Sequence, residues 1–119
     1  MKKVLVVDDE MEIVELIWMV LASNDLNILT ANDGLEALEI VREERPDLVL
    51  TDIMMLRMGG IQLTSLLLGH LATRDTVVLL MSAARQVDLD ASGARGLIRK
   101  PFDLDTLIET VHHHLEIAA

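Results

Sequence analysis

Short, continuous apolar runs recur along this chain and alternate with longer segments of helical periodicity. The runs lie at residues 4–7, 27–31, 48–50, 76–81 and 97–98. Because polar and apolar residues alternate little within them, both faces of each expected strand should be buried. Strands of this kind belong in a parallel sheet that helices cover on both sides, joined by right-handed crossovers. The sequence therefore predicts a doubly wound α/β fold with a five-stranded parallel sheet.

The segments between the strands carry apolar residues at helical spacing. Helices are expected over residues 11–22, from 32 or 33 to 42, over 61–71 and over 104–115, with weak helical character over 83–91. In the second helix, Leu35, Leu38 and Val41 form the expected apolar face. Asn32 or Asp33 is the expected N-cap of this helix, because both side chains can accept a hydrogen bond from its first turn.

Composition excludes several classes of protein. The chain has no cysteine, so disulfide scaffolds, thiol enzymes and cysteine-ligated zinc sites are excluded. Its formal net charge of −10 argues against direct binding to a nucleic-acid backbone. The longest unbroken apolar run, residues 16–22, is too short to insert across a membrane, and the run after Lys3 is too short for a signal peptide. A single acidic, cytoplasmic domain over residues 1–119 is expected.

Polar side chains follow the expected strands at the points where they end. Asp8 and Asp9 follow the first strand, Asp52 the third, Ser82 the fourth and Lys100 the fifth. In an open parallel sheet these ends share one edge, and ligands bind outside it where the winding direction reverses. We therefore expect these five residues to lie close together, although they are far apart in the sequence.

The chemistry of these five side chains indicates a cation and a phosphoryl group. Three carboxylates held close together repel one another, and a single ammonium group does not neutralise them. Mg²⁺ suits such a site, because it takes one or two protein carboxylates and leaves positions for water and phosphate oxygens. An aspartate beside the ion can attack phosphorus, while the ion, a lysine and a hydroxyl stabilise the transferred group. These residue types suit an aspartyl-phosphate site.

Five stretches of sequence occur in a familiar order. They are Val-Leu-Val-Val-Asp8-Asp9-Glu10, Ala31-Asn-Asp-Gly34-Leu-Glu-Ala-Leu38, Pro46-Asp-Leu-Val-Leu-Thr-Asp52, Leu80-Met-Ser82-Ala and Lys100-Pro101-Phe102. Together they resemble the motifs of the receiver domains of two-component response regulators, over essentially the whole chain. The resemblance implies the strand order 2-1-3-4-5 and a receiver domain spanning residues 1–119.

The resemblance also implies roles at the metal and at the acceptor. Asp52 would be the phosphorylated residue. Asp9 and Asp52 would ligate Mg²⁺ together with the main-chain carbonyl of Met54, and Asp8 would contribute mainly through water.

On the other side of the phosphoryl group, Ser82 would hydrogen bond to a phosphoryl oxygen and Lys100 would pair with the phosphate. The Lys100–Pro101 peptide bond would be cis. The phosphoryl donor would be a sensor histidine kinase, a phosphotransfer protein or a small acyl phosphate. The chain would switch a downstream protein or a tethered output domain, and it would not be an enzyme.

Several positions depart from the family pattern. Leu56 stands where proline is usual and Gly59 where Asp or Asn is usual, so the loop after Asp52 is expected to be looser. Leu97 replaces the usual aromatic switch residue. The stretch from Ser82 to Lys100 is about one helical turn shorter than is usual in the family, which predicts a shortened or irregular fourth helix. Ser82 and Leu97 are the expected switch positions, and the mode of signalling is expected to differ.

Two other functions remain open. The first is a module that keeps the pocket but binds its partner without phosphorylation, in which case Asp52→Ala would leave partner binding unchanged. The second is a small phosphatase with an aspartate nucleophile, which would turn over phosphoesters but has little chain from which to build a substrate pocket. A flavin site is disfavoured, because three acids follow the first strand where phosphate would bind.

Other conspicuous residues have simpler interpretations. His112–His114 resembles a metal tract, but consecutive helical residues point about 100° apart, so a solvated helix end is favoured. Met54, Met55 and Met58 are expected to fill the core and the loop. Trp18 lies outside the apolar stripe of its helix and is expected to be exposed, which leaves open a homodimer or another interface.

Overall fold

The computed structural model describes the backbone of residues 1–118 and the side chains of residues 1–116. Its strands are β1 (Lys3–Val7), β2 (Asn27–Ala31), β3 (Leu48–Asp52), β4 (Val77–Ser82) and β5 (Gly96–Arg99). Its helices are α1 (Met11–Ala22), α2 (Gly34–Glu44), α3 (Gly60–Leu68), α4 (Leu89–Ser92) and α5 (Leu104–Ala118). None of these helices has the length and apolarity needed to cross a membrane.

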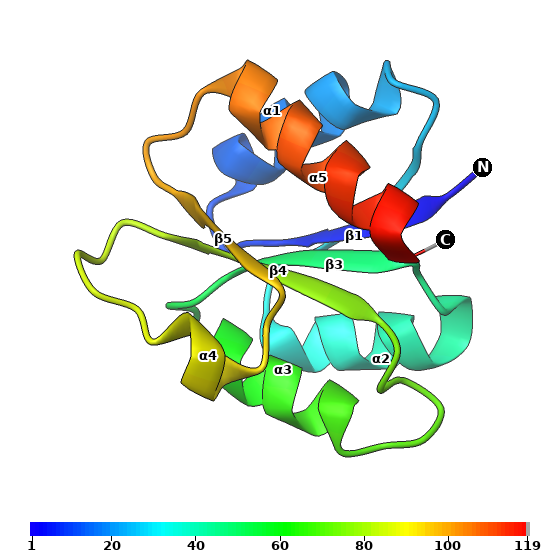
Figure 1. Ribbon diagram of the computed structural model, residues 1–119, viewed down its shortest axis with the longest axis vertical. Coiled ribbons are helices and arrows are strands. Elements are labelled where there is room, and N and C mark those ends of the chain that lie inside the picture. Colours follow the sequence, from blue (N-terminus) through cyan, green and yellow to red (C-terminus); the bar gives the residue numbers. More distant parts are fainter. Residues whose placement is uncertain (119) are drawn as a thin grey trace.

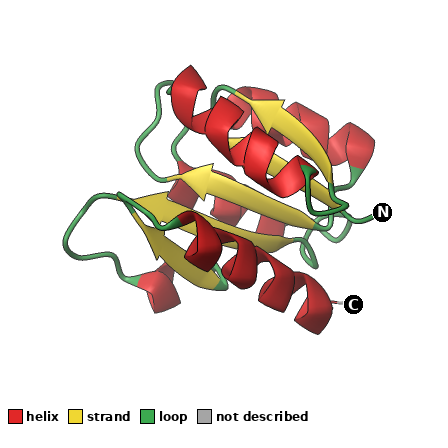
Figure 2. Ribbon diagram, turned by 90° about the horizontal axis from the view of Figure 1, so that it is seen from above, coloured by secondary structure: helices red, strands yellow, loops and turns green. Residues whose placement is uncertain are grey.

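All the strands pair in parallel, in the order β2-β1-β3-β4-β5. Helices α1 and α5 cover one face of the sheet, and α2, α3 and α4 cover the other (Figure 1). Figure 2 views the molecule from the side of α1 and α5, which lie in front of the sheet. The predicted doubly wound α/β fold and its strand order are confirmed.

The unbroken apolar runs are explained by a core on each side of the sheet. In β1, Val4 and Val6 pack into the core beneath α1 and α5, whereas Leu5 and Val7 pack into the core beneath α2 and α3. All four are completely buried. Because successive side chains of a strand point to opposite faces, a strand covered on both faces must be apolar throughout.

Helix α2 begins at a well-formed cap, but its buried face differs from the expected one. The Asp33 side chain accepts a hydrogen bond from Glu36 N at 2.9 Å, so Asp33 is the cap. The buried positions are Gly34, Ala37 and Val41, whereas Leu35 is 41% exposed, so the prediction for Leu35 was wrong. A Cβ atom at Gly34 would lie 2.5 Å from the main-chain oxygen of Met58, in the β3–α3 loop. Because Gly34 faces this loop, the next residue of the helix, Leu35, points toward solvent.

Replacing the Asp33 cap should destabilise the fold. Asp33 also pairs with Arg57 at 2.5 Å, and the Glu36 N–H followed by Arg57 lowers the pKa of Asp33. Its stabilisation is therefore present above pH 3.8 and is lost as the pH falls through the lowered pKa. We expect Asp33→Ala to reduce the free energy of unfolding by about 1–2 kcal/mol in urea titrations at neutral pH. Asp33→Asn retains a capping oxygen and should lose less, and equal losses would contradict this account.

The segment between β4 and β5 is mostly irregular. The weak helical character of residues 83–91 gives only the four-residue α4, and Gly93 ends it with φ 82°. The expectation of a shortened fourth helix is therefore confirmed. Helix α3 ends at Leu68 rather than at residue 71, because Gly69 ends the helix and a separate turn follows.

Candidate functional site

The residues that follow the strands meet at one edge of the sheet, on the left in Figure 1. Asp8 and Asp9 directly follow β1, Asp52 ends β3, Ser82 ends β4 and Lys100 follows β5. The parallel register places these ends side by side, with the last residue of β4 opposite the last residue of β5. The shared edge predicted from the sequence is therefore present.

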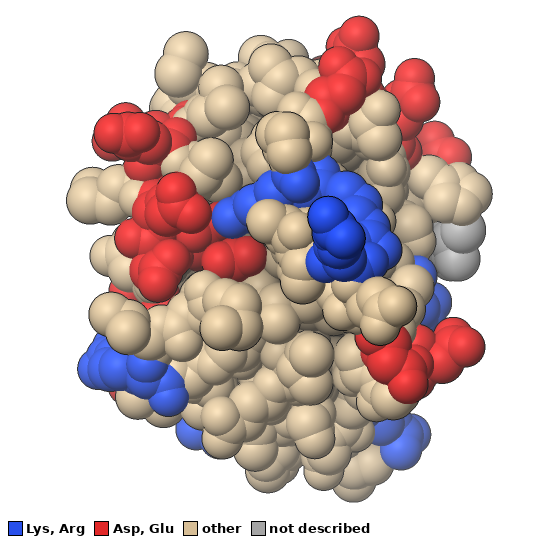
Figure 3. All heavy atoms as spheres, turned by 90° about the vertical axis from the view of Figure 1, so that its left-hand side faces the viewer, with Lys and Arg blue, Asp and Glu red and all other residues tan. Residues whose placement is uncertain are grey.

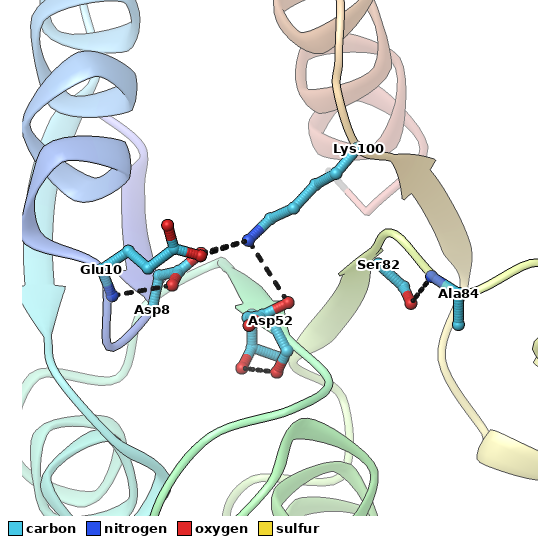
Figure 4. Close-up of polar contacts among 7 residues, drawn as sticks. Asp8, Glu10, Asp52, Ser82, Ala84 and Lys100 are labelled. Atoms are coloured by element: carbon cyan, nitrogen blue, oxygen red, sulfur yellow. Dashed lines mark hydrogen bonds and ion pairs between the residues drawn. The ribbon is translucent and has the colours of Figure 1, made fainter.

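The Lys100 ammonium group lies at the centre of this edge (Figure 4). Its Nζ is 2.7 Å from Asp8 Oδ2 and 3.4 Å from Asp52 Oδ1. Asp8 is completely buried and Asp52 is 8% exposed. The second oxygen of Asp8 accepts a hydrogen bond from Glu10 N at 3.0 Å, and Glu10 Oε1 lies 3.9 Å from Lys100 Nζ. Glu10 was not expected at the site, although its place directly after the two aspartates could have suggested it.

Burial and neighbouring charges shift the pKa values of Asp52 and Lys100. Burial, followed by the charge of Asp8, raises the pKa of Asp52, and Lys100 only partly opposes this. Burial by itself would lower the pKa of Lys100, but its hydrogen bond to Asp8 and the charges of Asp8 and Asp52 outweigh it and raise that pKa. The site is thus a buried cation between two carboxylates that are only partly neutralised.

The three aspartates form a candidate metal site. Asp8, Asp9 and Asp52 each offer one oxygen, and these oxygens lie within 4.8 Å of one another. Hard oxygen donors with excess negative charge fit Mg²⁺. Asp9 is exposed, so its carboxylate faces the solvent from which an ion would arrive.

Met54, which was expected to offer its carbonyl to the metal, and the histidine tract have different surroundings. The Met54 side chain is 78% exposed, in contrast to the expected core or loop filler, and the role of its carbonyl stays a prediction. Met58, by contrast, is buried. His112–His114 does not form a metal-ligand cluster with neighbouring side chains in the described part of the chain. His114 Nδ1 lies 2.8 Å from Thr110 O instead.

The glycines after Asp52 allow close packing. A Cβ at Gly60 would collide with the main-chain oxygen of Asp52, and one at Gly59 would lie 2.7 Å from Ile53 O. Gly60 N also donates to Ile53 O at 3.0 Å. The expected looseness of this loop is therefore offset by a tight return of the backbone onto Asp52.

Ser82 is near the charged cluster but is turned away from it. Its hydroxyl oxygen accepts a hydrogen bond from Ala84 N at 2.9 Å, and its carbonyl accepts one from Lys100 N at 2.9 Å. Figure 4 shows the hydroxyl directed toward Ala84 rather than toward Asp52. The structure therefore places Ser82 at the edge without joining its hydroxyl to the ion-paired group.

Two further expected positions lie outside the charged group. Leu97 is partly buried, lies opposite Leu80 in the sheet and packs into the core beneath α2 and α3. Trp18 is 48% exposed, as predicted. The Lys100–Pro101 bond is cis, as predicted.

The surface around the site carries an acidic patch and a basic patch side by side. Figure 3 shows the face at which the strands end, with acidic side chains gathered beside a compact group of basic ones. Such a face can bind a cation and a phosphate close together.

Neutralising Asp52 should stabilise the chain when Mg²⁺ is absent. A raised pKa favours the protonated folded state, so the contribution of Asp52 to stability falls as the pH rises above 3.8 through the folded pKa. At pH 7 without Mg²⁺, we expect Asp52→Asn to raise the unfolding temperature by a few degrees. Mg²⁺ should raise that temperature for the wild type but not for Asp52→Asn. Asp75→Asn, an exposed acid outside the site, is the matched control, and a wild type that does not respond to Mg²⁺ would contradict the metal assignment.

Comparison with known proteins agrees with this geometry. Residues 4–112 match the family model of the response regulator receiver domain. The structure is similar to that of the Francisella response regulator 1452 receiver domain, with a TM-score of 0.91, 29% identity and complete coverage of both chains. It is also similar to the chemotaxis response regulator CheY4 of Vibrio cholerae, with a TM-score of 0.89 and 29% identity over 96% of this chain and 98% of that one.

Curated relatives are longer than this chain. The DNA-binding response regulator MtrA of Mycolicibacterium paratuberculosis is 35% identical over 96% of this chain and 51% of its own length. The response regulator MprA of Mycobacterium leprae is 35% identical over 92% of this chain and 49% of its own length. The chain thus spans about half the length of these relatives. With its sheet order and its acidic edge, it belongs to the receiver domain family of two-component response regulators.

Proposed function

We propose that Asp52 accepts a phosphoryl group in a Mg²⁺-dependent reaction and that this modification switches a partner protein or a tethered output domain. The donor would be a histidine kinase or a phosphotransfer protein, and a small acyl phosphate could replace it. The observation that carries the proposal is the Lys100 ammonium group, held between Asp8 and Asp52 at 2.7 and 3.4 Å beside a cluster of three carboxylates.

The chemistry assigns a task to each side chain. A carboxylate oxygen of Asp52 attacks phosphorus, the bond from phosphorus to the donor nitrogen or oxygen breaks, and the donor leaves with the bonding electrons. Asp8, Asp9 and Asp52 would hold Mg²⁺, with the carbonyl of Met54 as a further ligand. When bound, the ion offsets negative charge as the phosphoryl group approaches the acids.

Lys100 and Ser82 act on the transferred group itself. Lys100 already lies beside Asp52, and its ammonium group can pair with a phosphoryl oxygen without a large movement. Ser82 must turn its hydroxyl away from Ala84 to donate to another phosphoryl oxygen. The movement of Ser82 and its loop would carry the signal, together with Leu97 at the position of the usual aromatic switch. The phosphoryl group stays on the protein, so the chain acts as an acceptor rather than as an enzyme.

The partner and the extent of the functional unit follow from the same proposal. Residues 1–119 would form the receiver unit, which contains its own acceptor, metal site and lysine. MtrA is named as a DNA-binding regulator, and this chain matches about half of it. For this chain we place any nucleic-acid binding in a partner or in a tethered domain, because its net charge is −10.

Acetyl phosphate tests the proposal directly. With Mg²⁺ present, we expect the intact mass to rise by one phosphoryl group, and hydroxylamine should remove this group because it is an acyl phosphate. Addition of a chelator before the acetyl phosphate should prevent the mass change. A wild-type protein that stays unmodified, or an adduct that resists hydroxylamine, would refute the proposal.

A second candidate is a module that binds its partner without phosphorylation. The aliphatic, partly buried Leu97 and the four-residue α4 favour it, because both alter the region that would relay the signal. Partner binding by Asp52→Ala separates the two functions. Unchanged affinity supports the second candidate, whereas a dependence of affinity on acetyl phosphate supports the first.

A further inference from the structure

Arg99, the last residue of β5, lies opposite Ser82 in the sheet and precedes Lys100 in the chain. No ion pair joins its side chain to a carboxylate among the side chains that the structure describes. Its guanidinium Nη1 instead donates hydrogen bonds to two main-chain carbonyl oxygens, those of Ala84 and Arg85, the latter at 3.0 Å. Arg99 therefore restrains the backbone of the β4–α4 loop.

That loop, residues 83–88, has few other restraints. Residues 83–86 are all exposed, and the loop has no regular secondary structure. Within the described chain, the backbone of residues 83–87 is held by the two hydrogen bonds from Arg99 and by the one from Ala84 N to Ser82 Oγ. Ala84 is thus fixed through its carbonyl by Arg99 and through its amide by Ser82.

This arrangement connects Arg99 to the orientation of the hydroxyl. Phosphoryl oxygens on Asp52 would attract the Ser82 hydroxyl, and its rotation would break the hydrogen bond from Ala84 N. While Arg99 holds Ala84 in place, that amide stays aligned with Ser82 and favours the resting orientation. We infer that Arg99 is a positioning residue that holds Ser82 turned away from Asp52 and thereby weakens binding of a phosphoryl group at the site. This inference rests on the proposed function of Asp52.

Arg99, the last residue of β5, and Lys100, which follows it, thus restrain the two halves of the site. The side chain of Lys100 holds the carboxylates, whereas that of Arg99 holds the loop that carries the hydroxyl. Leu97 stands where the family usually has its aromatic switch residue, and α4 is only four residues long. In this chain a guanidinium on the surface supplies the link between β5 and the loop.

Beryllium fluoride, a phosphoryl mimic, measures the effect when it is titrated with Mg²⁺ and followed by fluorine NMR. We expect Arg99→Gln to bind it about three- to tenfold more tightly than the wild type, because loss of the two hydrogen bonds frees Ala84 and lets Ser82 turn inward. Arg95→Gln is the matched control: it removes the same charge from an exposed residue that makes no hydrogen bond to the loop. Its affinity should equal that of the wild type.

The Ser82→Ala background separates positioning from a general effect of charge. If Arg99 acts through the hydroxyl, Arg99→Gln should leave the affinity unchanged when Ser82 is already Ala. The same tightening in both backgrounds, or no tightening of Arg99→Gln relative to Arg95→Gln, would overturn the inference. Arg99→Lys keeps the charge but lacks the planar group, so it should show a smaller shift in the same direction. It replaces Arg99→Gln if that variant does not fold.

The result also separates this inference from the proposed function. If the wild type binds beryllium fluoride and accepts phosphate while Arg99→Gln behaves like the control, only the role of Arg99 is refuted. If the wild type neither binds the mimic nor accepts phosphate, the proposed function fails and the inference fails with it.

Discussion

Asp52→Asn is expected to abolish the mass increase that acetyl phosphate and Mg²⁺ produce in the wild-type chain. The asparagine amide has no anionic oxygen with which to attack phosphorus. The substitution also removes one carboxylate from the three-aspartate cluster. The effect should be a complete loss rather than a reduction, because Asp52 is the acid at the end of β3 that Lys100 reaches, at 3.4 Å. Intact mass spectrometry at several reaction times measures it.

The control for this loss must remove an acid without touching the site. Asp75→Asn does so, because Asp75 is exposed and precedes β4 at the opposite end of the sheet. It should be phosphorylated like the wild type. An equal adduct on Asp52→Asn would place the phosphoryl group on another residue and would refute the assignment of Asp52 as the phosphorylated residue.

Lys100→Met should cause the largest loss of stability among changes at the site. The substitution leaves Asp8, which is completely buried, and Asp52, which is nearly so, without the cation between them. Breaking a buried pair by removal of one partner is strongly destabilising, so we expect the free energy of unfolding to fall by about 2–4 kcal/mol without Mg²⁺. Urea denaturation at neutral pH measures it, and added Mg²⁺ should recover part of the loss.

A double-mutant cycle isolates the Lys100–Asp8 pair. In the Asp8→Asn background one of the two facing charges is already absent, so Lys100→Met should cost clearly less than in the wild type. Lys2→Met, which removes an exposed ammonium group 4.0 Å from Asp47, should cost little. Equal costs of Lys100→Met in both backgrounds would show that the ion pair does not contribute to stability.

The same pair predicts how stability depends on pH. The pKa of Lys100 is raised above its ordinary value of 10.5, mainly because Asp8 and Asp52 outweigh the effect of its burial. The stabilisation by Lys100 is therefore fully present at neutral pH and is lost only as the pH rises through the raised pKa. Lys100→Met should thus differ most from the wild type at neutral pH and converge with it in strong alkali.

The elements most strongly encoded in the sequence were those with a clear hydrophobic pattern. Helix α1 and strand β2 have the predicted bounds. The prediction for Leu35 was wrong, because close contact between Gly34 and the β3–α3 loop rotates α2. Sequence periodicity identifies a helix, but packing against a neighbouring loop selects the face that it buries.

The site shows the same division. Asp8, Asp9, Asp52, Ser82 and Lys100 could be chosen from the sequence because parallel strands end at a common edge. The approach of Glu10 to Lys100 and the contact of Arg99 with the β4–α4 loop could not, because each depends on the conformation of a long, flexible side chain.

The sequence by itself therefore determined the layers, the strand order implied by the resemblance, and which charges share one edge of the sheet. These depend on hydrophobic burial, and the order of apolar and polar residues in the sequence shows which segments are buried. Only the tertiary structure decided that Lys100 lies between Asp8 and Asp52 and that Ser82 faces Ala84. Those choices depend on distances of a few ångströms between residues far apart in the sequence, and the packed fold sets them.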